Sequence, residues 1–404
     1  MEKRQILEQQ LEEINHILSE KYEKNEQIGV LSGISGIALF KFYYSKYKNN
    51  NTHADVGLEM LTEAVGRINN GYVYPTYCVG IAGAGWVMEH LLEEDLFEND
   101  NDELLEGLDD YLYKRMIADI KIGNFDFLHG AIGYGFFFLK RLRNTKKPDL
   151  KKRYKEFIDE LIDHLISTAI KEDNMLKWAS NLQHTRTNKG YNLSLSHGIP
   201  SILNFLAKVR KLELFNDKID PLLEGSINYI LNFKVETQED VSLFPSVIEK
   251  GKSIEYNSRL AWCYGDLGIG LTLWQVSTIK GYEKWKSEAL QILKHAAKRR
   301  SPESSKVIDA AVCHGSYGNA QIFNTMYKNT GDPLFKETAL FWIDDGISKA
   351  KYKDGYAGYK QWNGEEEAWK CDISLLEGVA GIGLTIIDHL ANFDTRWDEC
   401  LMIS

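Results

Sequence analysis

Two short stretches of the sequence place thiols beside an imidazole. Residues 263–265 (Cys-Tyr-Gly) and 313–315 (Cys-His-Gly) each lead into an apolar run, and their glycines lie 50 residues apart. If the chain is a repeat, these positions are equivalent, and Cys263, Cys313 and His314 can meet at one metal ion. Two sulfur ligands and one nitrogen ligand suit zinc and leave a fourth position open, as catalytic zinc sites do. Buried cysteines also serve as small apolar side chains, so this interpretation depends on the repeat.

The glycine step that follows these motifs recurs along the whole chain. Seven copies of Gly-x-x-Gly occur at spacings of 47 to 68 residues, and the fourth copy is degenerate because Ser201 replaces its second glycine. A period of about fifty residues is long enough for two helices with their connections. The first glycines of the seven steps are Gly33, Gly80, Gly130, Gly198, Gly265, Gly315 and Gly378.

The flanks of the steps have the patterns of two kinds of helix. Residues 133–139 are small or apolar throughout, as expected for a helix buried on all sides. Residues 154–170 and 283–298 carry apolar side chains at helical spacing among charged ones, which is typical of surface helices. We therefore expect an all-α protein, an α/α toroid of about seven helical hairpins that forms a single domain over residues 1–404. An open solenoid is the alternative, but it needs polar capping repeats, and the last repeat is as apolar as the others.

In a closed toroid the seven steps lie at one end, and the residue before each first glycine points toward a common mouth. Three histidines, a tyrosine and a glutamate fill five of these seven positions, although the chain has only ten histidines. Core packing does not account for such a set, so we place the chemistry at this mouth. The seven residues are Ser32, Val79, His129, His197, Tyr264, His314 and Glu377.

Four further polar residues are candidates for the chemistry at the mouth. His197 has no neighbouring cysteine, so it is free to act as a general acid or base rather than as a ligand. Asp126, three residues before His129, can orient or tune a histidine, or it can cap a helix. Arg259 can stabilise a developing oxyanion or form an ordinary surface ion pair. Tyr264 can donate a hydrogen bond to a substrate or simply line the wall.

Composition narrows the classes of function. The net charge of −10 and the lack of a basic run argue against binding to nucleic acid and against adhesion to an anionic membrane. Residues 1–20 have the pattern of a charged amphipathic helix, not of a signal peptide, and no apolar run reaches the ~18 residues that span a bilayer. Five cysteines in 404 residues fit a reducing, cytoplasmic environment. Three of them are interpreted as core or surface thiols: Cys78, Cys371 and Cys400.

Two stretches interrupt the helical pattern, residues 171–193 and residues 234–258. Both fall in longer gaps of the repeat, so we expect non-helical excursions, such as short hairpins, that shape a substrate groove near the mouth. The run Lys-Gly-Lys-Ser at 250–253 looks like the end of a phosphate-binding loop. Ser246 stands where that loop needs its leading glycine, and we expect no strand before it, so we predict no nucleotide cofactor.

The motifs together resemble the lanthionine synthetase C-like cyclases over essentially the full length of the chain. The resemblance rests on Ser-His-Gly at 196–198, Arg-Leu-Ala-Trp-Cys-Tyr-Gly at 259–265 and Cys-His-Gly at 313–315, with the glycine steps. That family is an α/α toroid with a catalytic zinc ion. The resemblance implies three Zn²⁺ ligands: Cys263, Cys313 and His314. It implies four catalytic residues: His197 as the acid or base, with Asp126, Arg259 and Tyr264.

One position departs from the pattern of the family. His129 stands where many relatives have glutamate before the glycine. We therefore leave His129 as a residue that faces the substrate or supports the site, without a firm role.

The resemblance implies an enzyme that forms thioethers. Such a cyclase adds a cysteine thiol of a peptide to a dehydroalanine or dehydrobutyrine of the same peptide, which gives lanthionine or methyllanthionine. The substrate is then a dehydrated precursor peptide, and the expected partners are a dehydratase and a peptide transporter. We expect a cytoplasmic protein that reaches the membrane only through such a complex, with zinc as its one cofactor.

Three alternatives stay open from the sequence. One type of relative joins glutathione to dehydrated proteins, and a glutathione pocket would distinguish it from a peptide cyclase. A glycosidase on an α/α toroid would carry paired carboxylates at the mouth, where histidine and tyrosine predominate here. A non-enzymatic peptide-binding scaffold with structural zinc would close the site with a fourth protein ligand.

Overall fold

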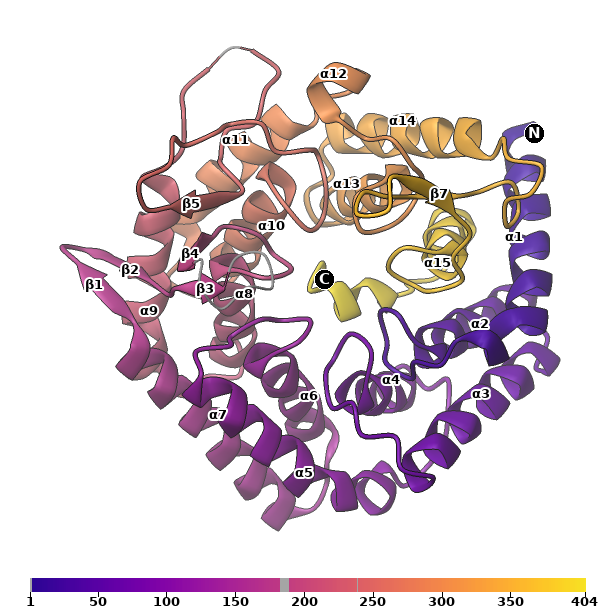
Figure 1. The fold of residues 1–404 in the computed structure, drawn as a ribbon, viewed down its shortest axis with the longest axis horizontal. Coiled ribbons are helices and arrows are strands. Elements are labelled where there is room, and N and C mark those ends of the chain that lie inside the picture. The colour runs from indigo at the N-terminus through magenta and orange to yellow at the C-terminus, as the bar shows by residue number, and fades with distance from the viewer. Residues whose placement is uncertain (1, 182–188, 238) are drawn as a thin grey trace. The chain divides into compact units, whose positions relative to one another are not determined.

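The structure is a computed structural model that describes residues 2–181, 189–237 and 239–404. Within these residues the chain is mostly helical, with a few short strands (Figure 1). The prediction of an all-α protein is therefore confirmed. Contacts divide the chain into two compact units, the first of Met1–Leu104 with Val307–Ser404 and the second of Leu105–Lys306. That the whole chain is one domain stays a prediction.

The first unit combines both ends of the chain. The N-terminal helix α1 packs against the last helix α15, α2 packs against α3, and α13 packs against α14. The elements of this unit are α1 (Glu2–Lys21), η1 (Tyr22–Lys24), α2 (Ile34–Lys48), α3 (Thr52–Asn69), α4 (Ile81–Glu93), α13 (Ser316–Thr330), α14 (Pro333–Lys349), β6 (Gln361–Asn363), β7 (Ala368–Lys370), α15 (Val379–Leu390) and η3 (Trp397–Leu401).

The second unit is the middle of the chain. Here α6 packs against α7, α8 against α9, and α10 against α11. Its elements are α5 (Asn101–Lys121), which begins in the first unit, α6 (Ala131–Asn144), α7 (Pro148–Thr168), β1 (Ile170–Glu172), β2 (Met175–Lys177), β3 (Ser180–Asn181), β4 (Lys189–Asn192), α8 (Ile199–Arg210), α9 (Asn216–Leu231), β5 (Val247–Glu249), α10 (Asp266–Ser277), η2 (Glu283–Trp285), α11 (Lys286–Ala296) and α12 (Pro302–Ser305).

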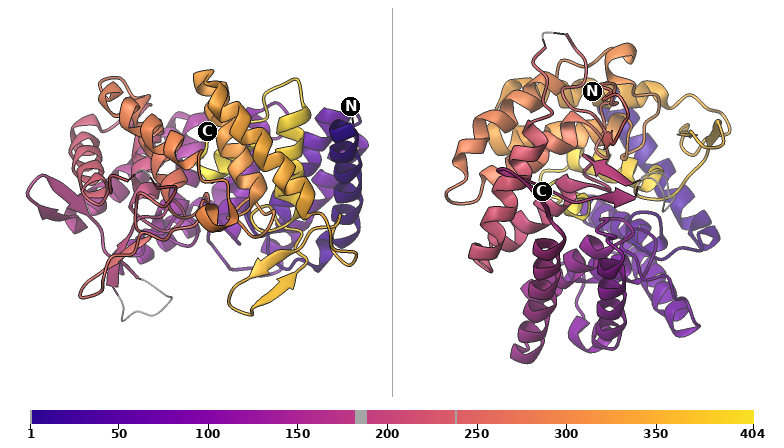
Figure 2. Two further views of the ribbon diagram at one scale, coloured as in Figure 1. Left: turned by 90° about the horizontal axis from the view of Figure 1, so that it is seen from above. Right: turned by 60° about the vertical axis from the view of Figure 1, so that its left-hand side comes forward.

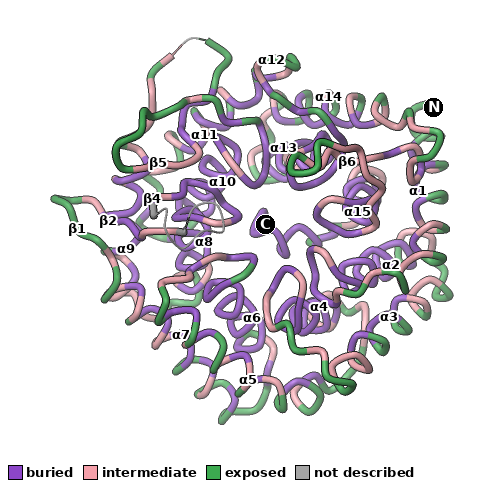
Figure 3. The backbone as a smooth tube through the Cα atoms, viewed as in Figure 1, coloured by how far each residue is buried: buried purple, intermediate pink, exposed green. Residues whose placement is uncertain are grey.

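Each glycine step starts a buried helix. The first glycine of all seven steps is the N-cap residue of a helix, namely of α2, α4, α6, α8, α10, α13 and α15. Figure 3 shows these helices mostly as buried backbone, whereas α3, α7 and α11 alternate between buried and exposed. The predicted alternation of buried and surface helices is confirmed. None of the described helices is both long enough and apolar enough to cross a membrane.

The second glycine of a step allows the helix to lie against its own turn. A Cβ atom added at Gly318 would lie 1.8 Å from the carbonyl oxygen of Val312, so any larger residue would push the turn and α13 apart. Gly265 has a different reason to be glycine. Its φ of +86° lies in the region that side chains disfavour, unlike the φ of the other six N-cap glycines.

The two predicted excursions contain most of the strands. The strands β1 and β2 form an antiparallel hairpin, and β3, β4 and β5 form an antiparallel sheet. Residues 182–188 of the first excursion lie outside the described residues. A cavity of about 220 Å³ lies beside β5, and its lining includes Glu249, Lys252 and Glu255. A groove for substrate in this region stays a prediction.

Two expectations about strands are corrected by the structure. The strand β5 directly precedes Lys250, although we expected no strand there. The other two features of a phosphate-binding loop are absent: Ser246 replaces its leading glycine, and residues 254–264 form no helix. A phosphate-binding loop is therefore still not formed. The second correction is the β6–β7 hairpin between α14 and α15, which lies outside both predicted excursions. The long gap of 63 residues between the last two glycine steps was the available indication.

Candidate functional site

Cys263 lies in the turn before α10, and only 5% of its surface is exposed. Its backbone carbonyl accepts hydrogen bonds from the backbone N–H groups of Leu195, at 3.0 Å, and Ser196, at 3.5 Å. These bonds join the turn before α10 to the turn before α8, where His197 lies. Two neighbouring glycine steps are thereby held together within the second unit.

A buried ion pair fixes the start of α10. Oδ2 of Asp266 lies 3.0 Å from Nη1 of Arg299, and both side chains are almost fully buried. The same carboxylate accepts hydrogen bonds from the backbone N–H groups of Leu243 and Phe244, at 3.0 and 3.2 Å. Asp266 therefore ties the second excursion to the helix that follows Cys263. Sequence reasoning missed this pair, because Arg299 lies beyond the end of α11 and 33 residues after Asp266.

His197 and Asp126 form a close pair in the second unit. Nδ1 of His197 lies 2.6 Å from Oδ2 of Asp126. Oδ1 of the same carboxylate accepts a hydrogen bond from the backbone N–H of His129 at 2.8 Å, and the backbone N–H of His197 donates to Oγ of Ser194 at 3.0 Å. The imidazole is held through Nδ1, so Nε2 is the nitrogen that can exchange a proton with another molecule.

The surroundings of this pair set its protonation. Burial by itself lowers the pKa of His197, but the charge and hydrogen bond of Asp126 and the charge of Cys263 outweigh it, and the net pKa is raised. Burial raises the pKa of Asp126, but His197 and His129 outweigh that effect, and the net pKa is lowered. Both shifts favour an imidazolium beside a carboxylate, an arrangement that can hold and release one proton.

Two other mouth residues flank His197. The ring centroid of His129 lies 6.4 Å from that of His197, with the planes 16° apart, and the ring centroid of Tyr264 lies 6.3 Å away. Burial is the main cause that raises the pKa of Tyr264, so its hydroxyl stays protonated and can donate a hydrogen bond. Three consecutive mouth positions are thus neighbours within one unit.

Cys313 and His314 lie in the turn before α13. The backbone N–H of Cys313 donates to the carbonyl of Leu376 at 2.9 Å, which joins this turn to the turn before α15. Nε2 of His314 lies 3.1 Å from Oδ2 of Asp309, and Nδ1 lies 3.7 Å from Oε2 of Glu377. The ring of His314 is therefore oriented by carboxylates on both of its nitrogens, with the shorter contact at Nε2.

Asp309 organises the turn around His314. Its Oδ1 accepts a hydrogen bond from the backbone N–H of Ala311, and its Oδ2 accepts one from the backbone N–H of Trp362 in β6, both at 3.1 Å. Burial raises the pKa of Asp309, but the bonds to His314 and to these amides outweigh it, so the net pKa is lowered. A histidine that binds a metal ion through one ring nitrogen usually donates a hydrogen bond to a carboxylate through the other.

Sequence reasoning missed Asp309, although a pattern pointed to it. In four of the seven steps, an Asn or Asp lies six residues before the first glycine. In three of these the side chain accepts a hydrogen bond from the backbone N–H two residues later, which is a side-chain turn typical of these residues. The four residues are Asn124, Asn192, Asp309 and Asp372.

Arg259 occupies the corresponding position before Gly265. Its side chain is exposed, and its guanidinium makes no hydrogen bond or ion pair with the residues that the structure describes. The role predicted for Arg259 therefore stays a prediction.

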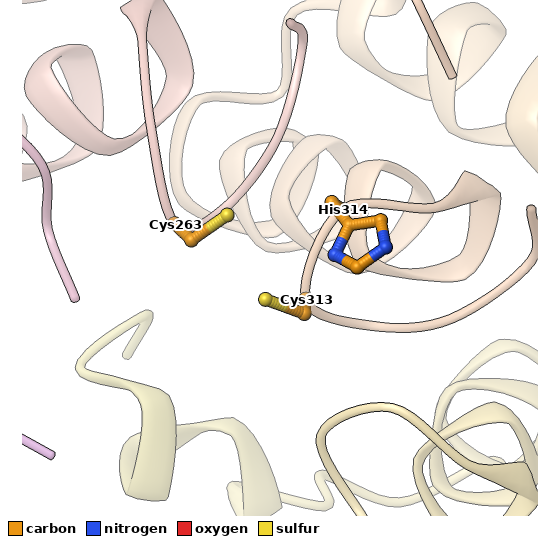
Figure 4. A group of neighbouring side chains, drawn as sticks. All are labelled: Cys263, Cys313 and His314. Carbon is orange, nitrogen blue, oxygen red and sulfur yellow. The ribbon is translucent and has the colours of Figure 1, made fainter. Parts of the chain in front are cut away.

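Two groups of metal-ligand residue types occur in the described part of the chain. The first is Cys263, Cys313 and His314, each of which offers one ligand atom (Figure 4). The second is His90, Glu93 and Glu399, in the first unit. Nε2 of His90 lies 2.9 Å from the hydroxyl of Tyr43, and its Nδ1 lies 3.6 Å from Glu399. Both nitrogens of His90 are thus engaged in a buried polar network.

Comparison with known proteins decides the family. The family model of the lanthionine synthetase C-like proteins matches residues 26–402. The chain belongs to the lanthionine synthetase C-like family. The predicted resemblance is therefore confirmed over nearly the whole chain.

Two curated members of the family are similar to this chain. Nisin biosynthesis protein NisC from Lactococcus lactis subsp. lactis is 24% identical over 344 residues, which cover 80% of this chain and 76% of NisC. Glutathione S-transferase LANCL1 from Danio rerio is 22% identical over 321 residues, which cover 78% of this chain and 73% of LANCL1. The two relatives are about equally similar, so the family membership leaves the substrate open.

The fold of this chain is similar to a solved structure. Nisin cyclase matches with a TM-score of 0.76 at 18% identity, and the match covers 98% of this chain and 97% of the cyclase. Nisin cyclase is an α/α toroid, so the fold class predicted from the glycine steps is confirmed.

Proposed function

We propose that this protein is a zinc-dependent lanthipeptide cyclase that adds peptide cysteine thiols to dehydroalanine or dehydrobutyrine. The observation that carries the proposal is the group of Cys263, Cys313 and His314 at the starts of two helices, in which Asp309 engages Nε2 of His314. Membership of the family and the likeness to NisC support the same reaction.

The donor set fits zinc. Two buried cysteines supply thiolates, and His314 supplies a nitrogen whose ring is oriented by an ionised carboxylate. Zinc prefers such sulfur and nitrogen ligands, and three protein ligands leave one position for a substrate. Zinc bound there would lower the pKa of a substrate thiol, which otherwise titrates at about 8.5, and would supply it as a thiolate at neutral pH.

The His197–Asp126 pair is proposed to manage the proton. The addition forms one bond from sulfur to the β-carbon, removes one proton from the thiol and adds one proton to the α-carbon. His197 is held through Nδ1, so Nε2 can take up the thiol proton and return it to the α-carbon. Asp126 keeps the ring in place and stabilises its charged form between the two transfers.

Two further residues are proposed to act on the substrate carbonyl, where negative charge develops during the addition. The hydroxyl of Tyr264 lies in the neighbouring mouth position to His197 and stays protonated. The guanidinium of Arg259 has no partner among the described residues, so a substrate oxygen can become its partner. Hydrogen-bond donors aimed at a developing oxyanion are among the largest contributions to catalysis.

The proposal includes partners and location. The substrate is a peptide that already contains dehydro residues, so a dehydratase has to act before this protein. We propose that this dehydratase and a peptide transporter form a complex with it, in the cytoplasm at the membrane surface. The net charge of −10 disfavours direct binding of the protein to anionic lipid.

The test uses a synthetic dehydrated peptide with one cysteine, incubated with zinc-loaded protein and then with N-ethylmaleimide. Ring closure does not change the mass but removes the free thiol, so we expect product without a maleimide adduct. Complete labelling after prolonged incubation would overturn the proposal. A parallel reaction includes glutathione. A product heavier than the peptide by one glutathione would show that the protein adds glutathione to the dehydro residue instead.

A further inference from the structure

The β6–β7 hairpin presents an aromatic face. Trp362 and Trp369 are paired directly across the two strands, and their ring centroids lie 5.5 Å apart with the planes at 62°. The ring of Tyr352 lies 5.2 Å from that of Trp369. All three side chains are partly exposed. In the left view of Figure 2 the hairpin, in yellow, extends away from the helices of its own unit.

The turn of this hairpin is acidic. Residues 364–367 connect the strands and include three consecutive exposed glutamates. Glu366 pairs with Lys370, but the carboxylates of Glu365 and Glu367 make no hydrogen bond or ion pair with the described residues. Two negative charges therefore lie beside the aromatic face without a counter-charge.

Two lysines near the hairpin, Lys351 and Lys360, already have partners within the chain. Nζ of Lys360 lies 2.6 Å from Asp354. Nζ of Lys351 and of Lys360 also lie 5.8 and 5.7 Å from the ring centroid of Tyr352. An aromatic ring attracts a cation placed over its face. Among the described residues no cation lies over Trp362 or Trp369, so both indoles can accept one from another molecule.

The hairpin is anchored to the carboxylate that holds His314. Oδ2 of Asp309 accepts the backbone N–H of Trp362 at 3.1 Å and lies 3.1 Å from Nε2 of His314. A peptide bound on the hairpin is therefore next to the turn that carries Cys313 and His314. The arrangement suits a subsite that holds one part of a peptide while another part reacts.

We propose that this aromatic hairpin, defined by Trp362, Trp369, Tyr352, Glu365 and Glu367, binds a lysine- or arginine-bearing segment of the substrate peptide. The inference rests on the proposed function for the identity of the substrate. The two uncompensated carboxylates attract the cationic group, and the indoles cover its aliphatic stem and face its charge. The hairpin thus selects substrates by a charge at a fixed distance from the reacting cysteine.

The test measures binding without any reaction. The probe is a fluorescein-labelled linear peptide with one cysteine, two lysines and serine in place of each dehydro residue, and its analogue has norleucine in place of lysine. We expect Glu365→Gln/Glu367→Gln to weaken binding of the lysine peptide roughly fivefold to tenfold at low salt and to leave the norleucine analogue unchanged. We expect Trp369→Ala to weaken binding of both peptides.

The matched control is Glu2→Gln/Glu59→Gln, which removes the same charge from exposed positions of α1 and α3. Equal affinities of the control and the hairpin double variant for the lysine peptide would overturn the inference, as would wild-type protein that binds both peptides equally. The binding assay needs neither zinc nor catalysis. Lysine-dependent binding with no ring closure in the maleimide assay would therefore refute only the proposed function. Ring closure without lysine-dependent binding would refute only the proposed role of the hairpin.

Discussion

Nδ1 of His197 lies 2.6 Å from Oδ2 of Asp126, although the two residues are 71 positions apart in the sequence. Each residue lies in the turn before a buried helix, Asp126 before α6 and His197 before α8, and these helices pack against each other. The repeat therefore brings together an acid and a base that the local sequence keeps apart. In the proposed reaction this pair transfers the proton.

We expect His197→Ala to keep its zinc and lose most of its ring-closing activity. The proposed ligands do not include His197, so the metal site is complete without it. General acid–base catalysis contributes roughly 10²- to 10⁴-fold, which sets the size of the expected loss. The rate is measured by maleimide blocking and mass spectrometry, and zinc by metal analysis. Ring closure at the wild-type rate would show that His197 has only a structural role, and His129 would be the next candidate.

We expect Asp126→Asn to shift the pH dependence of ring closure. The charge of Asp126 raises the pKa of His197 against the effect of burial, so its removal lowers that pKa. His197 must be neutral to accept the thiol proton, so activity rises as the pH passes its pKa. In the variant this rise occurs at lower pH than in the wild type. Profiles of kcat/KM against pH for the two proteins provide the test, and a shift to higher pH, or none, would contradict it.

We expect Asp309→Asn to weaken zinc binding by roughly 10- to 100-fold, the usual effect of losing the carboxylate behind a histidine ligand. Competition with a chromophoric chelator measures the affinity. Asp372→Asn is the matched control, because Asp372 makes the same turn in the next repeat but accepts its hydrogen bond from Ser374. If both variants bind zinc like the wild type, His314 is not held by Asp309 for a metal.

We expect the stability of the first unit to depend on pH because Lys41 is buried there. Burial lowers the pKa of Lys41 to about 7, and Nζ meets the carbonyl oxygen and Oδ1 of Asn15 at 2.8 and 2.7 Å. Between this pKa and the ordinary value of 10.5, the unfolded chain binds a proton that the folded chain does not. The free energy of unfolding therefore rises with pH across this window, by at most about 1.4 kcal/mol per pH unit.

The comparison with Lys41→Met isolates this effect above pH 7, because His53, whose pKa burial and the charge of Lys41 lower below its usual 6.5, is neutral there. Urea unfolding from pH 6 to pH 10 should show wild-type stability rising relative to the variant above pH 7. A constant difference over the whole range would mean that Lys41 keeps its charge, held by the oxygens around its Nζ.

The sequence predicts the parts of the fold that a repeated backbone geometry demands. The glycine steps that start the seven buried helices are visible because the close approach of the helix to the carbonyl oxygens of the preceding turn excludes larger residues, as at Gly318. Cys263, Cys313 and His314 are noticeable in the sequence because thiols and an imidazole are unusual side chains just before a buried helix. What depends on side-chain contacts between distant turns is not visible in the same way.

Three particular cases show this limit. Asp126 could be assigned to a histidine from the sequence, but only the structure shows that its carboxylate pairs with the ring of His197 and accepts a hydrogen bond from the backbone N–H of His129. The β6–β7 hairpin was missed because strands of three residues are too short for an alternating pattern to emerge. Arg259 is exposed and makes no hydrogen bond or ion pair with the described residues, so its predicted role stays untested.

The most direct test of the central claim is a zinc titration of one metal-free preparation, in which the rate of ring closure is measured against zinc bound per chain. The account predicts no ring closure above the uncatalysed rate without zinc, a linear rise with bound zinc, and saturation at one zinc per chain. A Cys263→Ala/Cys313→Ala variant should neither bind zinc stoichiometrically nor gain activity. Full activity in the metal-free protein, or one zinc per chain in the double variant, would contradict the account.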